Sequence, residues 1–311
     1  MAKLAIIGTG FVGASLSLAL RRSKLFEVIS GYDRDRTRLA AAKRIGAVDQ
    51  EAPSSAAAVQ QAAVVVLTVP GRELLSAFDE LAPGLSPGAV VTETSRWKVP
   101  ATEAARTLPP EVHFIAGRPV LDDRGHDAEE ARAEVFRNAI YCLSPGQAAS
   151  EAAVNAMSAL VTAAGAQPYF LDPAEHDGLT AAGELLPPAL LAVTISALTS
   201  HPRWDEAGKL AGDTFNQLAQ LAEDAGPALW QEAAQNSAAL ARWLDTTAAA
   251  LLDLRDRLND SDQIEADWQA TLQALARWRR DKRLLQESTM PPMNELKPNL
   301  FGKLLKARAS R

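Results

Sequence analysis

Three glycines near the N-terminus have the spacing of an anion-binding turn. Gly8, Gly10 and Gly13 form the pattern G-x-G-x-x-G between an apolar run at residues 4–7 and an Ala- and Leu-rich stretch at residues 14–20. In such a turn the first glycine allows a tight bend, the second lets the backbone approach a pyrophosphate, and the third lets the helix pack on the strand. The free N–H groups at the start of that helix favour the anion. The pattern predicts a buried strand, a phosphate-binding turn and a helix.

An acidic residue follows where a ribose contact is expected. Asp33 ends a second apolar run, residues 27–32, and stands twenty residues beyond Gly13, so its carboxylate can accept hydrogen bonds from an adenosine ribose. Together the two features predict a dinucleotide-binding unit of the Rossmann type; a glycine turn in another α/β fold is the alternative. We expect cofactor contacts from the turn and from the ends of neighbouring strands, at Gly8, Thr9, Gly10, Phe11, Val12, Gly13, Asp33, Arg34, Val69, Pro70 and Thr94.

The same acid bears on which nicotinamide cofactor is preferred. A carboxylate at Asp33 repels a 2′-phosphate, which favours NAD over NADP. Arg34 and Arg36 follow at once and could contact a phosphate, so NADP is not excluded. The alternative for both arginines is a solvated first turn of the next helix.

The elements that would position these residues alternate along the first half of the chain. The strongest apolar run, residues 63–69, is continuous and β-branched, as in a central parallel strand. The segments between runs predict helices, including a charged helix at residues 128–136. Alternation of strands and helices predicts an α/β fold class, with a Rossmann-type, doubly wound parallel sheet over residues 1–171. The other expected strands cover residues 47–49, 89–94, 113–116, 139–143 and 168–171.

Strand patterns end at residue 171, and residues 172–287 have the Ala- and Leu-rich spacing of helices. Their apolar content exceeds the need of one small bundle, which predicts an all-α dimerisation domain and a homodimer; a self-contained bundle is the alternative. Four or five helices are expected, with breaks at Pro187-Pro188, His201-Pro202, Gly226-Pro227 and Asn259-Asp260.

The last segment, residues 288–311, is mostly basic and contains three prolines. We expect this tail to wrap a partner subunit or to remain loose. One short amphipathic helix is expected in it, at residues 300–305.

Composition places the chain among ordinary globular proteins. Of its 311 residues 47% are hydrophobic and 23% are charged, and the formal net charge of −6 argues against a broad nucleic-acid surface. No apolar run of bilayer-spanning length is expected, and the first strand begins too early to leave room for a signal peptide. The one cysteine, Cys142, lies in an apolar run and is expected to be a buried thiol. We therefore expect a cytoplasmic protein with no membrane or nucleic-acid partner, and no metal site is predicted.

Several short motifs occur in one order along the chain. They are residues 91–98 (VTETSRWK), Gly117-Arg118-Pro119, residues 172–177 (DPAEHD), Leu186-Pro187, and Leu229-Trp230 followed by Asn236. Together with the glycine pattern, this order resembles the prephenate and arogenate dehydrogenase family over residues 1–285. The resemblance implies NAD(P)-dependent oxidative decarboxylation of prephenate or arogenate, which makes precursors of tyrosine.

Two motifs of the first domain are altered relative to that family. In the motif that resembles T-D-x-G-S-x-K, Glu93 replaces the aspartate, Ser95 falls on the glycine, Arg96 falls on the serine that orients the substrate hydroxyl, and Lys98 is kept. In the G-x-H-P motif, Arg118 falls on the histidine that hydrogen-bonds the ring hydroxyl. A guanidinium stays protonated and has no acceptor, so Arg118 cannot take that proton. Loss of a general base is expected to lower the rate by roughly 10²- to 10⁴-fold.

The motif at the domain junction is kept in part. It resembles E-H-D-x-x-x-A-x-x-S-H-L-P-H, in which His176 and Asp177 match. Glu184, Leu185 and Pro188 occupy the positions of the serine and of both later histidines. The resemblance therefore covers the scaffold more fully than the reaction centre.

Other polar residues are candidates to replace the missing groups. Arg96, Lys98 and Arg118 follow strand ends and could together bind a carboxylate or a phosphate; the alternative is surface charge at a loop rim. His126, in the polar loop at residues 121–126, is a candidate substitute base, and a solvated loop histidine is the alternative. The candidate catalytic residues are Ser95, Lys98, Arg118 and His126.

The helical domain adds two candidates for substrate binding. Glu184, at the start of an apolar helix, could face the cleft as an acid with a raised pKa, and a solvated helix turn is the alternative. His176 matches the junction histidine of the family, for which we expect a structural role that caps or braces the long helix. The residues expected at the substrate are Arg96, Arg118, His176 and Glu184.

These observations favour an NAD-dependent oxidoreductase that moves hydride between nicotinamide C4 and a small anionic substrate. Its site is expected in an interdomain cleft, at the carboxyl ends of the first, fourth, fifth and sixth strands. Two alternatives stay open. One is a related dehydrogenase that acts on a different anion, and the other is a non-catalytic dimer that binds NAD.

Overall fold

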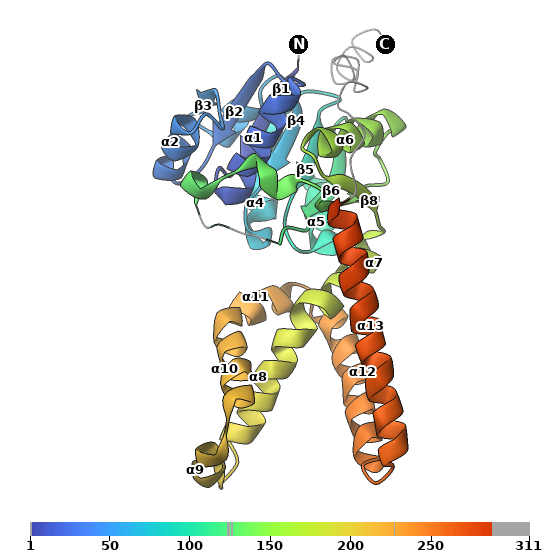
Figure 1. The fold of residues 1–311 in the computed structure, drawn as a ribbon. Helices are drawn as coiled ribbons and strands as arrows, with labels where there is room; N and C mark the ends of the chain where they lie inside the picture. Colours follow the sequence, from blue (N-terminus) through green and yellow to red (C-terminus); the bar gives the residue numbers. More distant parts are fainter. Residues whose placement is uncertain (1, 123–124, 126, 227, 288–311) are drawn as a thin grey trace. The chain divides into compact units, whose positions relative to one another are not determined.

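The computed structural model describes residues 2–287 apart from 123–124, 126 and 227 (Figure 1). The chain forms two compact units. Among the described residues, one comprises residues 2–173 together with 276–287, and the other is Ala174–Leu275. The expected basic tail and its helix at residues 300–305 lie outside the described residues.

One sheet of eight strands forms the centre of the first unit. The strands are β1 (Lys3–Ile7), β2 (Val28–Tyr32), β3 (Gln50–Glu51), β4 (Ala62–Leu67), β5 (Val90–Glu93), β6 (His113–Pro119), β7 (Ile140–Pro145) and β8 (Gln167–Phe170). Their order in space is β3-β2-β1-β4-β5-β6-β7-β8, and β1 to β6 are parallel. Because the chain reverses its direction of progress between β1 and β4, a ligand site is expected outside the carboxyl ends of these two strands.

Helices cover both faces of this sheet (Figure 1). They are α1 (Phe11–Ser23), α2 (Arg36–Arg44), α3 (Ser55–Val59), α4 (Leu74–Leu81), α5 (Lys98–Ala104) and α6 (Glu151–Ala163), with 3₁₀ turns η1 (Gly71–Glu73), η2 (Ala82–Gly84) and η3 (Ala105–Thr107). The prediction of an α/β, doubly wound fold is confirmed.

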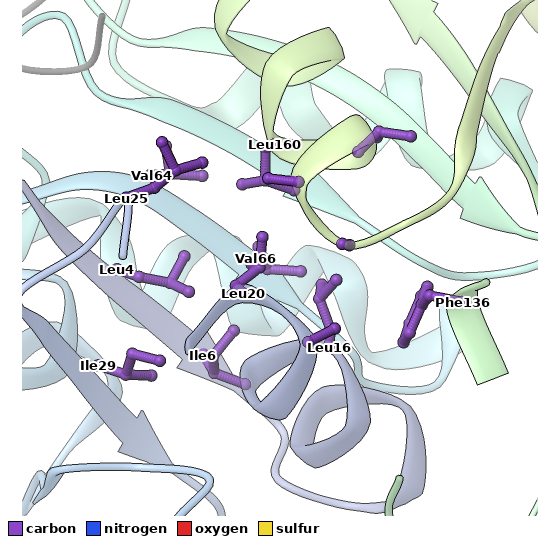
Figure 2. Packing of buried hydrophobic residues seen from close by; sticks show 14 of the residues in the cluster. Leu4, Ile6, Leu16, Leu20, Leu25, Ile29, Val64, Val66, Phe136 and Leu160 are labelled. Atoms are coloured by element: carbon purple, nitrogen blue, oxygen red, sulfur yellow. The ribbon is translucent and has the colours of Figure 1, made fainter. Parts of the chain in front are cut away.

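Alternate residues of the central strands supply two separate hydrophobic cores. Figure 2 shows the first, in which Leu4 and Ile6 of β1 and Val64 and Val66 of β4 pack with Leu16, Leu20, Leu160 and their neighbours from α1 and α6. The intervening residues, Ala5, Ile7, Val65 and Leu67, pack on the other face with α3, α4 and α5. Both faces of β1 and β4 are therefore dry, which explains why these strands are continuous apolar runs.

The last two strands run opposite to the rest. β7 pairs antiparallel with β6, with Pro119 opposite Tyr141, and β8 pairs parallel with β7. The prediction of a parallel sheet is therefore correct for β1 to β6 and wrong for β7 and β8. A parallel pair needs a crossover to the other end of the sheet, usually a helix. The described part of residues 120–139 contains only two 3₁₀ turns, η4 (Ala128–Glu130) and η5 (Ala133–Phe136), so β7 starts where β6 stops.

The helix predicted at residues 128–136 is thus also wrong. Between η4 and η5 the backbone of Ala131 and Arg132 is extended. The Arg132 N–H donates to the Ser15 hydroxyl of α1 at 3.1 Å, and Phe136 is buried in the core beside α1. Packing against α1 therefore outweighs the helical propensity of this segment.

The third strand is displaced from its predicted place at residues 47–49. β3 is Gln50–Glu51, while Ala47 and Val48 pack in the core and the Asp49 carboxylate accepts the Ile29 N–H at 2.8 Å. The Asp49 N–H also donates to the Ile29 carbonyl at 2.8 Å. Residues 47–49 are thus held by side-chain packing and by hydrogen bonds between Asp49 and β2.

The helical region begins at the boundary of the two units. Its elements are α7 (Pro173–Thr180), the π-helical turn η6 (Ala181–Leu185), α8 (Leu186–Thr199), α9 (Trp204–Ala207), the 3₁₀ turn η7 (Gly208–Leu210), α10 (Asp213–Ala225), α11 (Ala228–Gln235), α12 (Ser237–Asp256) and α13 (Ser261–Glu287). Over the described residues this gives six continuous helices, with α7 and α8 counted as parts of one, against the four or five predicted. The chain between His201 and Asn236 contributes three of them, α9, α10 and α11.

The predicted break at Pro187-Pro188 is wrong. The helix is continuous from Pro173 to Thr199, and the two prolines lie in its middle, in the first turn of α8. The π-helical turn directly precedes them, and such a turn changes the hydrogen-bond spacing. The missing N–H groups of the prolines therefore fall where the regular ladder is already interrupted.

This continuity changes one expectation about apolar runs. The 27-residue helix Pro173–Thr199 has a window of mean hydropathy 1.6, and 17% of that window is buried. By length and composition alone the helix is sufficient to cross a membrane, contrary to the expectation that no run has that length, although core helices of soluble proteins also meet this criterion. Exposed apolar surface of this extent is typical of a site that contacts another protein or a membrane.

A test of the second core uses Phe78, which is fully buried in α4 and meets the Phe114 ring edge to face at 5.7 Å between centroids. Phe78→Ala is expected to lower the free energy of unfolding by about 3–5 kcal/mol, because an aromatic side chain is lost and a cavity remains. Leu75→Ala on the same helix is the matched control, since Leu75 is 51% exposed, and should cost less than about 1 kcal/mol. Urea unfolding followed by circular dichroism measures both, and equal losses would contradict the packing.

Candidate functional site

The turn after β1 is held against the end of β4. Gly8 has φ +92°, and a Cβ there would lie 2.8 Å from the Thr68 carbonyl oxygen. The Gly8 N–H donates to the Tyr32 carbonyl at 2.8 Å, and the Thr68 hydroxyl donates to the Gly8 carbonyl at 2.5 Å. A glycine is therefore required at position 8 both by its backbone conformation and by the close approach of β4.

The other two glycines of the pattern differ in what surrounds them. A Cβ on Gly13 would lie 2.2 Å from the Gly8 carbonyl oxygen and 2.6 Å from the Thr68 hydroxyl, whereas a Cβ on Gly10 would have no atom of the described chain within 4 Å. Gly10 is the N-cap of α1, and in the described structure no side chain caps this helix. Gly13 is thus fixed by packing, and Gly10 leaves the N–H groups of the first turn open to an anion.

A cavity of about 340 Å³ opens at this turn. Of the residues predicted to contact a cofactor, Gly8, Gly10, Asp33, Arg34, Val69 and Pro70 line it. The remaining predicted residues, Thr9, Phe11, Val12, Gly13 and Thr94, lie outside the lining.

Two of these residues, Thr9 and Thr94, join the ends of neighbouring strands. The Thr9 N–H and hydroxyl donate to one Asp33 carboxylate oxygen at 2.7 and 3.3 Å, which ties the turn to the end of β2. The Thr94 N–H donates to the Leu67 carbonyl at 3.0 Å and so ties β5 to β4. The carboxyl ends of β1, β2, β4 and β5 are therefore tied to one another, and those of β1, β2 and β4 border the cavity.

A buried ion pair lies at the end of β5. The Lys98 ammonium donates to the Glu93 carboxylate and to the Gly117 carbonyl, the latter at 2.7 Å, and both side chains are fully buried. The second Glu93 oxygen accepts the Ser95 N–H at 2.6 Å. These contacts join β5, the segment 94–97 and β6, and they direct the Lys98 charge into the protein.

The phenol of Tyr141 in β7 lies near this pair. Burial raises the pKa of Tyr141 well above its ordinary value, and the Glu93 carboxylate adds to the effect. Tyr141 is therefore a neutral phenol at every working pH.

The three basic residues predicted to bind an anion, Arg96, Lys98 and Arg118, are buried or half-buried. Arg118, on β6 opposite Cys142, is 4% exposed, and Arg96 is half-buried. The alternative of surface charge at a loop rim therefore does not hold for Lys98 or Arg118. Cys142 is buried, as predicted. Ser95 is buried with its hydroxyl donating to the Trp97 carbonyl at 3.4 Å, and His126 lies outside the described residues.

In the helical unit, His176 belongs to a bracing network. It is 1% exposed, and its Nδ1 lies 3.0 Å from one Asp177 carboxylate oxygen, whose partner oxygen accepts the Asn236 side-chain amide at 2.9 Å. The Trp243 indole donates to the Gly178 carbonyl at 2.9 Å. These contacts tie α7 to the start of α12, whereas Glu184 lies half-buried in the π-helical turn η6.

Several residues of the cavity were not expected from the sequence. Arg38, Arg72, Glu73 and Glu80 line it together with Asp33. Glu73 and Glu80 are seven residues apart, the spacing that places two residues on one face of a helix two turns apart. That spacing, from the N-cap of α4 at Glu73 to Glu80 within α4, is the signal that could have found them. Over the described residues no group of metal-ligating side chains occurs.

A sheet in the order 3-2-1-4-5-6, with a glycine turn after its first strand and an acid after its second, defines a dinucleotide-binding protein of the Rossmann class. Residues 16–170 match the family model described as prephenate dehydrogenase, nucleotide-binding domain. The chain belongs to the prephenate and arogenate dehydrogenase family.

Individual relatives agree with this assignment. The chain is 27% identical over 231 residues to a prephenate dehydrogenase of Bacillus subtilis, covering 73% of this chain and 62% of the relative. It is 28% identical over 255 residues to a probable prephenate dehydrogenase of Streptomyces niveus, covering 81% and 68%. The matched part thus spans less than two thirds of the length of the Bacillus protein.

Solved structures show the same fold. Prephenate dehydrogenase from A. aeolicus in complex with hydroxyphenyl propionate and NAD+ is similar with a TM-score of 0.77 and 20% identity, over 89% of this chain and 98% of that chain. Synechocystis arogenate dehydrogenase is similar with a TM-score of 0.75 and 25% identity, over 90% and 99%.

Two alanine substitutions separate packing from anion binding at the turn. Gly13→Ala is expected to lower the free energy of unfolding by about 2–4 kcal/mol, because its Cβ collides with backbone and β4. Gly10→Ala should change stability by less than about 1 kcal/mol and weaken dinucleotide binding at least tenfold, because its Cβ enters the anion's space. Thermal unfolding and calorimetric titration with NAD and NADP measure the two effects. Unchanged binding by the Gly10 variant would contradict the role given to the turn.

Proposed function

We propose that this protein is an NAD-dependent oxidoreductase that transfers hydride between nicotinamide C4 and a small anionic substrate of the prephenate or arogenate type. The observation that carries the proposal is the cavity at the glycine turn, which combines an open helix N-terminus with the carboxylate of Asp33. The related A. aeolicus enzyme was solved with NAD+. We further propose that the protein acts in the cytoplasm, in tyrosine biosynthesis.

The residues present fit such a cofactor. A Cβ on Gly10 would extend into open space, so the backbone leaves room for a pyrophosphate, and the first-turn N–H groups of α1 would bind it. Asp33, at the same cavity, would accept a hydrogen bond from the ribose of the adenosine. Bound NAD would supply the hydride acceptor at C4, and the chain's own residues would position the dinucleotide.

The residues proposed to contact the substrate are cations that can bind an anion, and they cannot act as a general base. Arg118 stays protonated at any working pH and cannot accept the proton that leaves a substrate hydroxyl. Lys98 is fully buried against Glu93 and donates to the Gly117 carbonyl, so its part is to hold the end of β6 that carries Arg118. Arg118 and Arg96 would bind the carboxylate of the substrate by charge-assisted hydrogen bonds.

One observation favours a second candidate function. A permanent, 4% exposed cation at Arg118 replaces the titratable histidine of the resembled motif. A site with this charge suits a related dehydrogenase whose substrate is a different small carboxylate or phosphate.

Turnover assays distinguish the two functions. The wild-type protein is expected to bind NAD and to form NADH from prephenate or arogenate slowly. Arg118→His should raise that rate at least tenfold, because a neutral imidazole restores a proton acceptor. Arg106→His is the matched control, since Arg106 is exposed and pairs with Glu103 at 2.8 Å outside the cavity, and it should leave the rate unchanged.

Absence of any gain in Arg118→His, with NAD binding intact, would contradict prephenate and arogenate as substrates. It would favour the dehydrogenase of another anion. Tight NAD binding without NADH formation from such acids would favour a non-catalytic dimer.

The apolar surface of the helical unit supports a homodimer. Val193 and Leu198 in α8 are 55% and 44% exposed, and Leu251 and Leu252 in α12 are 58% and 53% exposed. Soluble monomers rarely expose so many large apolar side chains on neighbouring turns of a helix. A second copy of this chain would cover such faces, as obligate dimers do.

Sedimentation equilibrium tests this assembly. The wild-type protein is expected to be a dimer at micromolar concentration, and Val193→Asp should raise the dimer dissociation constant at least tenfold, because it buries a charge in an apolar interface. Leu75→Asp, at a similarly exposed site in the first unit, should leave the dimer intact. A monomeric wild-type protein, or equal effects of the two aspartates, would contradict the proposed interface.

A further inference from the structure

The rim of the nucleotide cavity carries an arginine that is already engaged by two carboxylates. The Arg34 guanidinium donates to Glu80 at 2.6 Å and to Glu73 at 3.3 Å. All three residues line the cavity at the glycine turn. The hydrogen bond from Arg34 to Glu80 raises the pKa of Arg34 above its ordinary value, so the guanidinium stays charged and keeps both of its partners.

Asp33, the neighbour of Arg34, is itself largely occupied. One oxygen accepts from the Thr9 N–H and hydroxyl, and the other accepts the Asp35 N–H at 2.9 Å. A carboxylate has about four lone-pair sites, so about one remains for a ribose hydroxyl. Asp33 therefore places a negative charge near the ribose but cannot by itself hold both hydroxyls.

The remaining arginines of the cavity are matched in the same way. Arg38 lies 3.8 Å from Asp35 and 3.3 Å from Asp127, and Arg72 lies 3.8 Å from Glu73. The lining holds four carboxylates, Asp33, Asp35, Glu73 and Glu80, against these two arginines and Arg34. Cations that could bind a phosphate are thus present but balanced by acids.

We propose that Glu73 and Glu80 set the preference of this site for NAD by engaging the guanidinium of Arg34, which would otherwise bind the 2′-phosphate of NADP. The inference rests on the proposed function, because it assumes that a nicotinamide dinucleotide occupies the cavity. An arginine beside the ribose is the group that accommodates a 2′-phosphate in sites of this fold. Preference in this protein is therefore determined by α4 and η1, forty residues and more from the acid that follows β2.

The two glutamates oppose NADP in two ways. Each occupies donors of Arg34 that a phosphate would need, and each adds a negative charge near a dianion. Exposed ion pairs of this kind are individually weak. Substitution of either glutamate by glutamine should therefore raise the ratio of NADP affinity to NAD affinity by about three- to tenfold. Removal of both should change it by about ten- to a hundredfold.

The experiment measures the dissociation constants of NAD and NADP by calorimetry for the full-length protein and its variants. Glu80→Gln and Glu73→Gln/Glu80→Gln are expected to tighten NADP binding by these factors, with NAD binding changed by less than about threefold. Arg34→Gln added to the double variant should abolish the gain, because it removes the group that reads the phosphate. Glu103→Gln is the matched control, since it breaks an exposed ion pair with Arg106 outside the cavity.

The outcomes separate this inference from the proposed function. If NAD binds and the double variant keeps the wild-type ratio, or if the gain persists without Arg34, the inference is overturned and the proposed function stands. If neither dinucleotide binds to the wild-type protein or to any variant, the proposed function itself fails. Thermal unfolding of each variant confirms that the exposed substitutions leave the fold intact.

Discussion

The hydrogen bond between the Thr68 hydroxyl and the Gly8 carbonyl is the contact on which the rest of the cavity depends. It joins the carboxyl ends of β1 and β4, the two strands at which the sheet changes its direction of progress. The contact forms only because position 8 has no Cβ and adopts φ +92°, and because Gly13 lets α1 approach within van der Waals range of the same carbonyl. Together these contacts aim the uncapped N-terminus of α1 at one point outside the sheet.

A second constraint acts at the neighbouring pair of strands, and it is electrostatic. Glu93 and Lys98 are fully buried, so their charges must be satisfied by one another and by the backbone groups around them. The Ser95 N–H and the Gly117 carbonyl complete the set. Loss of one partner from a pair of this type typically costs 3–5 kcal/mol. The segment between β5 and α5 is therefore tied to the carboxyl end of β6, beside Arg118.

The sequence was sufficient for those parts of the fold that depend on local patterns. The glycine spacing and the apolar runs predicted β1, α1, β2 and β4. They did so because parallel strands that are buried on both faces consist of nearly continuous apolar residues. The reversal of β7 was not predictable in this way, because it follows from the packing of residues 128–136 on α1 and not from their own propensity. Likewise, Pro187-Pro188 normally ends a helix, and only the π-helical turn before it shows why this helix continues.

The residues of the candidate site also differ in whether a local sequence pattern could predict them. Asp33 and the glycines were predictable because one motif places them, whereas Glu73 and Glu80 reach Arg34 across a sheet whose register no local pattern gives. A pattern also cannot tell whether a lysine is a surface group or, like Lys98, a buried partner of an acid.

The dinucleotide site and the proposed substrate site are consequently under different structural constraints. The part that would hold the dinucleotide is made mostly by backbone, since N–H groups of the first turn of α1 and the shape of the glycine turn do the binding. Substitutions elsewhere leave these groups unchanged as long as the turn folds. The part proposed to meet the substrate consists of side chains at the ends of β5 and β6, where Arg96 is half-buried and Arg118 is 4% exposed. A permanent cation at such a position cannot act as a proton acceptor, whereas a titratable side chain could. Membership in the family therefore constrains the cofactor more tightly than the substrate.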